Sequence, residues 1–139
     1  MSYNLSRYLN AQERDYEIAL AEIKRGRKTS HWMWYIFPQI AGLGFSETSK
    51  QFAIQNMEEA KAYLEHPQLG KRLVEISRAL LDLEGKTASQ IFGSPDDMKL
   101  KSSMTLFDTV PNAPIIFGQV LDKYYDGQKD EKTLALLAQ

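Results

Sequence analysis

The stretch PQLGKRLVEISRALLDLEG, residues 67–85, carries the clearest structural pattern in the chain. Charged residues occupy many of the positions between the regularly spaced large aliphatic residues of an apolar stripe. A proline at the start and a glycine at the end are typical of the two ends of a helix. Steps of four, three, four and three place the stripe on one helical face. Its members are Leu69, Leu73, Ile76, Leu80 and Leu83. The pattern predicts an amphipathic helix with one buried side.

Other segments carry start and stop signals of the same kind. Asn56 with Glu59 and Thr87 with Gln90 fit capping boxes, and Ser94 before a proline fits a helix start. We find no sustained period-two alternation and no hairpin signal. The sequence therefore predicts an all-α fold, a single compact domain over residues 1–139 with about seven to nine helices. Helices are expected near 12–25, 31–37, 57–66, 67–85, 87–93, 95–110, 114–125 and from 130 to the C-terminus.

Composition limits the possible classes of function. Seventeen basic and eighteen acidic residues give a net charge of −1, without the basic excess of a nucleic-acid binder, so no nucleic-acid partner is expected. The chain has no cysteine and two histidines, which excludes thiolate chemistry and argues against a metal site or other cofactor. A polar N-terminus and the lack of a long apolar run predict a cytoplasmic protein without membrane association.

The stretch SHWMWYIFPQ, residues 30–39, contains both tryptophans of the chain. Ser30 can cap a helix there and Pro38 must end it, so we expect about two helical turns. Apolar side chains would point in every direction from such a helix. This predicts a Trp-rich helix at the centre of the bundle, enclosed by the other helices. The alternative is that the helix lines a pocket.

Polar groups at the ends of this stretch form the first candidate site. His31 would lie in the first turn, where the helix dipole favours a neutral imidazole. Arg27 and Lys28 add positive charge just before it, and a helix start flanked by cations can bind an anion. Gln39 would emerge beside the glycine-containing loop 40–44. A core histidine with a backbone partner is the structural alternative.

The second candidate site lies in the segment Ser94–Phe107. Asp96, Lys99 and Ser103 share one helical face. A lysine and a serine four residues apart occur in serine–lysine catalysis, which requires a buried lysine with a lowered pKa. A weak surface ion pair between the aspartate and the lysine is the structural alternative.

The two segments resemble the two signatures of the family called domain of unknown function 1810. The first match is residues 30–39 followed by Gly42-Leu43-Gly44, and the second is residues 91–100 followed by 102–107. The resemblance covers nearly the whole chain and implies a small, all-helical bacterial domain without an established activity. Some members bear the label calpastatin, a eukaryotic protease inhibitor that is disordered and repeat-bearing, whereas this chain has core-forming periodicity and no repeats.

Three hypotheses about function follow. The first is a domain that binds a small polar or phosphate-bearing ligand in a cleft between the segments His31–Gln39 and Ser94–Phe107. The second is a protein-interaction or self-associating module, and the sequence does not indicate an oligomeric state. The third is a cofactor-free hydrolase of nucleotide- or ADP-ribose-type substrates, with His31 or Asp97 as proton carrier. The expected ligand-binding residues are His31, Trp32, Gln39, Asp97, Lys99 and Ser103.

Overall fold

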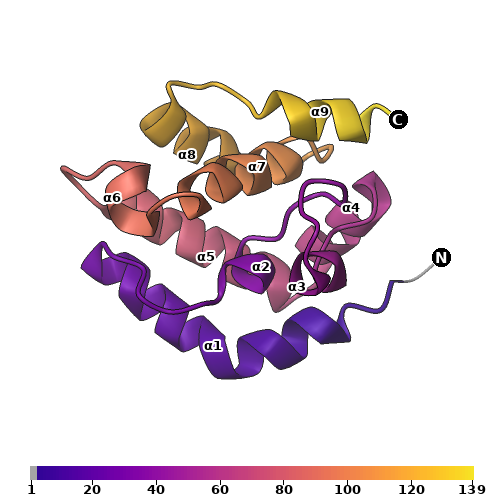
Figure 1. Cartoon of the computed structure of the whole chain (residues 1–139), viewed down its shortest axis with the longest axis horizontal. Coiled ribbons are helices and arrows are strands. Elements are labelled where there is room, and N and C mark those ends of the chain that lie inside the picture. The colour runs from indigo at the N-terminus through magenta and orange to yellow at the C-terminus, as the bar shows by residue number, and fades with distance from the viewer. Residues whose placement is uncertain (1–2) are drawn as a thin grey trace.

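The structure, a computed structural model, describes residues 3–139 and confirms the all-α fold (Figure 1). Within this range the chain forms nine helices and no strand, apart from an isolated parallel bridge between Ile40 and Ile54. The helices are α1 (Ser6–Arg25), α2 (Met33–Ile36), α3 (Glu47–Gln51), α4 (Met57–Glu65), α5 (Leu69–Asp82), α6 (Ala88–Phe92), α7 (Asp96–Asp108), α8 (Ile116–Tyr125) and α9 (Glu131–Leu137).

Helix α5 carries the predicted apolar stripe and packs against α1, α4 and α8. Four of the five stripe residues are buried and Leu83, just after the helix, is half-buried. The helix begins at Leu69, after the proline that we placed in its first turn. The ring nitrogen Nδ1 of His66 accepts hydrogen bonds from the backbone N–H groups of Gln68 and Leu69, at 3.1 and 3.3 Å. His66 therefore satisfies N–H groups that a helix start leaves without partners.

Both predicted capping boxes start helices, but in the first one Glu59 accepts a hydrogen bond from the N–H of Gln55 rather than from that of Asn56. The side chain of Asn56 accepts a hydrogen bond from the N–H of Glu59 at 2.9 Å, and Thr87 with Gln90 forms a complete capping box. Asp130 caps α9 through the N–H of Thr133. These side chains replace the partners that the first turn of a helix lacks, which is why the sequence locates these starts well.

Other boundaries differ from the prediction. Helix α1 begins six residues earlier than expected, at Ser6 rather than at position 12. Helix α3 was not predicted, because five polar residues after the cap Ser46 contain no apolar stripe. The prediction that Ser94 caps α7 was wrong: Pro95 occupies the cap position, and the carbonyl of Gly93 accepts the hydrogen bond from the N–H of Asp97.

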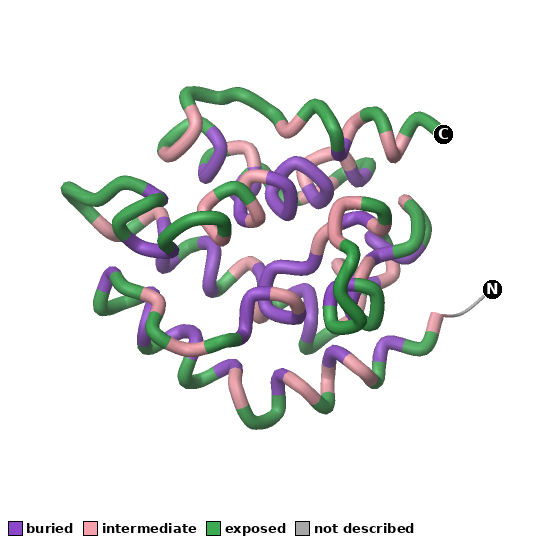
Figure 2. The backbone as a smooth tube through the Cα atoms, viewed as in Figure 1, coloured by how far each residue is buried: buried purple, intermediate pink, exposed green. Residues whose placement is uncertain are grey.

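The Trp-rich segment packs against α1 and lies near the middle of the view in Figure 1, but it is helical over one turn only, not two. Its side chains are not all enclosed, because His31 is exposed and Trp34 is half-buried. Ser30 does not cap it, because the Ser30 hydroxyl donates to the carboxylate of Glu22 at 2.5 Å instead. Trp32 and Phe37 are at most 1% exposed, as a central segment requires (Figure 2). Their rings meet the ring of Phe92, with centroid distances of 5.9 to 6.3 Å, so aromatic packing joins the segment to α6.

Candidate functional site

A buried carboxylate determines how the Trp-rich segment is presented. Glu22 of α1 accepts hydrogen bonds from the N–H groups of Thr29 and Ser30 at 2.8 and 3.0 Å, and from the indole Nε1 of Trp32 at 2.9 Å. Burial alone would raise the pKa of Glu22, but these bonds and the Ser30 hydroxyl lower it to about 2. The turn before α2 is thus fixed to α1, with Trp32 directed into the core.

The second tryptophan, Trp34, is half-buried and faces the start of α7. The ammonium of Lys99 lies 4.0 Å from the centre of the Trp34 ring, within the range of a cation–π interaction. Asp96 binds the ammonium of Lys99 at 3.1 Å and that of Lys28 at 2.9 Å. Burial would raise the pKa of Asp96, but the two lysines hold it below its ordinary value. The two segments singled out in the sequence therefore meet in space.

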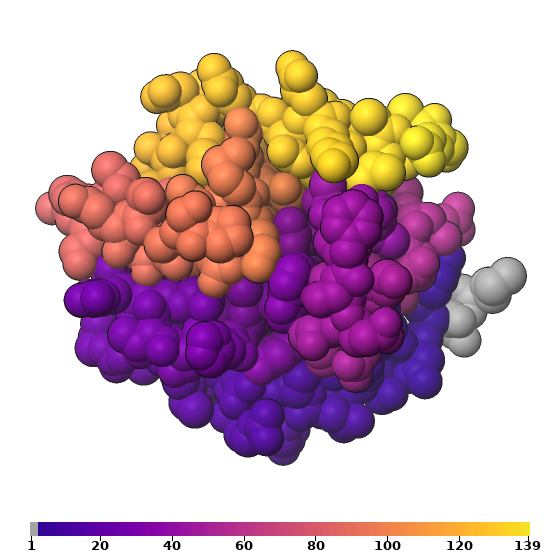
Figure 3. Space-filling view, viewed as in Figure 1, coloured from indigo at the N-terminus to yellow at the C-terminus, as the bar shows by residue number. Residues whose placement is uncertain are grey.

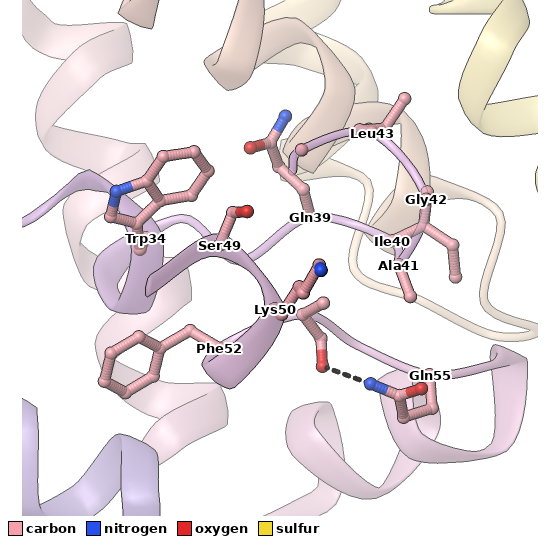
Figure 4. A pocket seen from close by; sticks show the side chains of 12 residues that line it. Trp34, Gln39, Ile40, Ala41, Gly42, Leu43, Ser49, Lys50, Phe52 and Gln55 are labelled. Atoms are coloured by element: carbon pink, nitrogen blue, oxygen red, sulfur yellow. Dashed lines mark hydrogen bonds between the residues drawn. The ribbon is translucent and has the colours of Figure 1, made fainter. Parts of the chain in front are cut away.

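A cavity of about 190 Å³ lies beside Trp34, bounded by the loop from Gln39 to Gly44 and by helix α3 (Figure 4). Its polar lining comes from Gln39, Ser49, Lys50 and Gln55, and Phe52 lies below Ser49 in the view of Figure 4. In the space-filling view, the purple residues of this loop and the orange residues of α7 lie on two sides of a recess (Figure 3). The cavity combines an aromatic wall with a few convergent polar groups, as ligand pockets do.

Backbone contacts hold the walls of this cavity in place. The N–H of Ala41 donates to the carbonyl of Ile54, and the N–H of Ile54 donates to the carbonyl of Gln39, both at 2.8 Å. Gly44 lies so close to α3 that an added Cβ atom would be 2.6 Å from the hydroxyl of Ser49. Gly42 adopts a φ of +106°, which favours glycine. The loop is therefore fixed by hydrogen bonds and close packing.

The six residues expected to bind a ligand are distributed unevenly around the cavity. Gln39 lines it, and Lys99 reaches its Trp34 wall. His31 precedes α2, outside the first turn where we expected it, and is exposed. Trp32 belongs to the core. Asp97 is half-buried, its carboxylate accepts a hydrogen bond from the N–H of the next residue, and its carbonyl accepts one from a tyrosine, Tyr125.

Ser103 lies in the buried part of α7 and does not line the cavity. Its hydroxyl has no hydrogen-bond partner among residues 3–139, so it makes no hydrogen bond to Lys99. Lys99 is bound to Asp96 instead. Serine–lysine catalysis requires the lysine to accept the serine proton, and this arrangement does not provide that contact.

The sequence analysis did not predict that four further residues belong to the cavity or to the charged cluster beside it. They are Trp34, Asp96, Lys28 and Lys50. Lys28 was noted only as a nearby charge, although its side chain is 8% exposed. Both tryptophans lie in the same short segment, and Trp32 is the one that binds Glu22 and packs against Phe37 and Phe92 in the core. The one available signal was the face shared by Asp96 and Lys99 in the sequence, which did not identify Trp34 as their neighbour.

Among residues 3–139 no group of three or more histidine, aspartate or glutamate side chains is arranged to hold a metal ion. Within the same range no helix combines the length and the apolar character that crossing a bilayer requires.

Comparison with known proteins places the chain among proteins of undetermined role. The family described as "Protein of unknown function (DUF1810)" matches residues 2–137. The crystal structure of the conserved hypothetical protein Rv1873 from Mycobacterium tuberculosis superimposes with a TM-score of 0.95 at 45% sequence identity, covering 97% of this chain and 96% of that one. No curated protein matches the chain.

Proposed function

The chain belongs to the DUF1810 family of proteins of unknown function, and we propose that it binds a small polar, phosphate-bearing ligand in the cavity beside Trp34. The observation that carries the proposal is the contact between Lys99 and the Trp34 ring at 4.0 Å. This contact joins a cation to an aromatic wall at the edge of a cavity. A cytoplasmic location is part of the same proposal.

Free hydrogen-bonding groups inside the cavity support this function. Neither the side-chain amide of Gln39 nor the ammonium of Lys50 has a partner among the described residues. An amide offers one acceptor and two donor hydrogens, and an ammonium offers three donors. A sugar or a ring with polar substituents would match such a lining.

Local charge favours an anionic group on the ligand. Lys28 and Lys99 share a single carboxylate, that of Asp96, which leaves about one positive charge over. Lys50, an exposed residue of the cavity lining, adds a second cation. Two cations at the edge of a partly enclosed site attract an anion more strongly than they would in open water.

The size of the cavity limits the part of the ligand that enters it. Its volume of about 190 Å³ lies below the roughly 300–1,000 Å³ of pockets that enclose a whole drug-sized molecule. A single ring or one sugar unit would fit against Trp34, with the charged group at the opening. Nucleoside monophosphates and sugar phosphates are the simplest compounds with this layout.

A thermal-shift screen tests the proposal with AMP, ADP-ribose, ribose 5-phosphate and glucose 6-phosphate as probes. A binder should raise the melting temperature, and more so as its excess over Kd grows. Trp34→Ala and Lys99→Gln should weaken binding of the best probe by about tenfold or more, since a contact worth about 1.4 kcal/mol corresponds to tenfold. Lys61→Gln, which removes an exposed lysine of α4, is the matched control. Equal affinity in all variants contradicts the proposal.

A further inference from the structure

A second positively charged region lies away from the Trp34 cavity, at the end of α1. The sequence Lys24-Arg25-Gly26-Arg27-Lys28 places four cations within five residues of a chain whose net charge is −1. Lys24, Arg25 and Arg27 are exposed, and none of them forms an ion pair with any residue from 3 to 139. An unpaired cluster of like charges raises the energy of the folded state, so this arrangement is favoured where an anion can neutralise it.

The backbone of this basic turn is held rigidly from three sides. Gly26 ends α1 in the left-handed conformation, and its carbonyl accepts a hydrogen bond from the ammonium of Lys86 at 3.1 Å. The N–H of Lys28 donates to the carbonyl of Ile91 in α6 at 2.7 Å. Glu22 binds the two N–H groups that follow the turn. Rigid presentation reduces the entropy lost when a ligand binds.

The turn forms one wall of a cavity of about 510 Å³, and α6 with the residues before it forms the other. Three cations from two separate segments line it, Arg27 and Lys28 from the turn and Lys86 from the opposite wall. Ser89 and Gln90 supply polar groups, and no acidic residue is part of the lining. Asp96 neutralises Lys28, so Arg27 and Lys86 carry the uncompensated charge.

We infer that this cavity is a second binding site, for an anion of the pyrophosphate class with at least two adjoining negative charges. A guanidinium presents two parallel N–H donors to a phosphate, and a lysine across the cavity supplies a second point of attachment. The volume lies in the range of pockets for small ligands. None of its lining residues lines the cavity beside Trp34, so the inference does not depend on the function proposed above.

Calorimetric titration of the full chain with sodium pyrophosphate at low ionic strength tests this inference. Arg27→Gln and Lys86→Gln should each weaken binding by about tenfold or more, and added salt should weaken it further. Lys61→Gln removes one positive charge from α4, at the opposite end of the molecule from α6 (Figure 1), and should leave the affinity unchanged. Trp34→Ala should also leave it unchanged, which separates this site from the first.

Arg27→Gln is the decisive variant, because the Arg27 side chain makes no hydrogen bond or ion pair within residues 3–139 and its loss should not disturb the fold. Lys86→Gln also removes the bond to Gly26, so its melting temperature is measured alongside. The inference is overturned if the chain gives no binding heat with pyrophosphate, or if Arg27→Gln binds as tightly as Lys61→Gln. A single-stranded oligonucleotide tests whether the basic turn binds a nucleic-acid backbone instead. Binding of the oligonucleotide that pyrophosphate does not displace would also overturn the inference.

Discussion

At the scale of single residues, Glu22 has the widest influence on the candidate site. Its carboxylate accepts four hydrogen bonds from Thr29, Ser30 and Trp32 while being 3% exposed. Hydrogen bonds to a charged acceptor are strong, and removing the charge weakens all four, including the buried bond to the Trp32 indole. The residue therefore connects α1 both to the basic turn and to the Trp-rich segment.

We predict that Glu22 makes the free energy of unfolding depend on pH in the acidic range. The pKa of Glu22 is about 2 in the folded chain, against an ordinary value of 4.5. Between these two pH values the unfolded chain therefore binds more protons than the folded chain. The free energy of unfolding consequently falls as the pH drops from about 5 towards 2. The loss should be about 3 kcal/mol for this one group. Glu22→Gln should be less stable at neutral pH and should lack this part of the profile, as measured by urea unfolding. The control variant is Glu13→Gln, because Glu13 is exposed. If Glu22→Gln had the same dependence of stability on pH as the parent chain, Glu22 would not be the group responsible.

The two tryptophans should respond differently to substitution. Trp32→Phe removes a core indole and its bond to Glu22, so we expect a loss of about 2–4 kcal/mol in unfolding free energy. Trp34→Phe removes part of a half-buried ring and should cost about 1 kcal/mol or less. Chemical denaturation of both variants measures the difference. Equal losses would mean that Trp34 is as much a core residue as Trp32.

At the scale of helices, the approach of α4 to α5 depends on Gly70. A Cβ atom added there would lie 2.1 Å from the carbonyl oxygen of Leu64, a distance that only a shift of the backbone could relieve. We predict that Gly70→Ala lowers the unfolding free energy by about 3 kcal/mol or more. The neighbouring exposed Lys71 gives the control Lys71→Ala, which should stay within about 0.5 kcal/mol of the parent. Thermal unfolding of the pair checks the prediction, and similar melting temperatures would refute it.

Helices with local signals were predictable from the sequence, and those set by distant contacts were not. The apolar stripe of α5 and the caps at Asn56, Thr87 and Asp130 depend on residues within a few positions of one another. The predicted length of α2 assumed that the hydroxyl of Ser30 caps the helix. In the structure this hydroxyl donates to Glu22 of α1 instead. No local pattern contains that preference.

The same distinction applies to the candidate site. The sequence singled out the two segments that meet, and the resemblance to DUF1810 rests on the same segments. It did not identify Trp34 as the half-buried tryptophan that lines the cavity, nor Asp96 as the residue that joins Lys28 to Lys99. Those choices depend on tertiary contacts between α1, the Trp-rich segment and α7, which periodicity along one helix does not determine.

At the scale of the whole molecule, one continuous segment, exposed at the basic turn and buried at Trp32, connects the two candidate binding sites. The chain from Glu22 to Gln39 begins at the basic turn, passes through the core at Trp32, and ends at the cavity lined by Trp34 and Gln39. Helix α7 reaches the same segment through Asp96 and Lys99. Substitutions in the core of this segment should therefore affect both cavities, whereas substitutions at their rims should affect one.

The most direct test of the proposed function uses the two indole N–H signals in a nitrogen–proton correlation NMR spectrum, because the chain has two tryptophans. Trp32 is buried and bound to Glu22, whereas Trp34 lines the cavity. On titration with AMP or ribose 5-phosphate, the signals of the Trp34 indole and of the Gly42 and Gly44 amides should shift, while the Trp32 indole signal stays in place. Shifts that exclude Trp34, or no shift with either compound at saturating concentration, would contradict a ligand site beside Trp34.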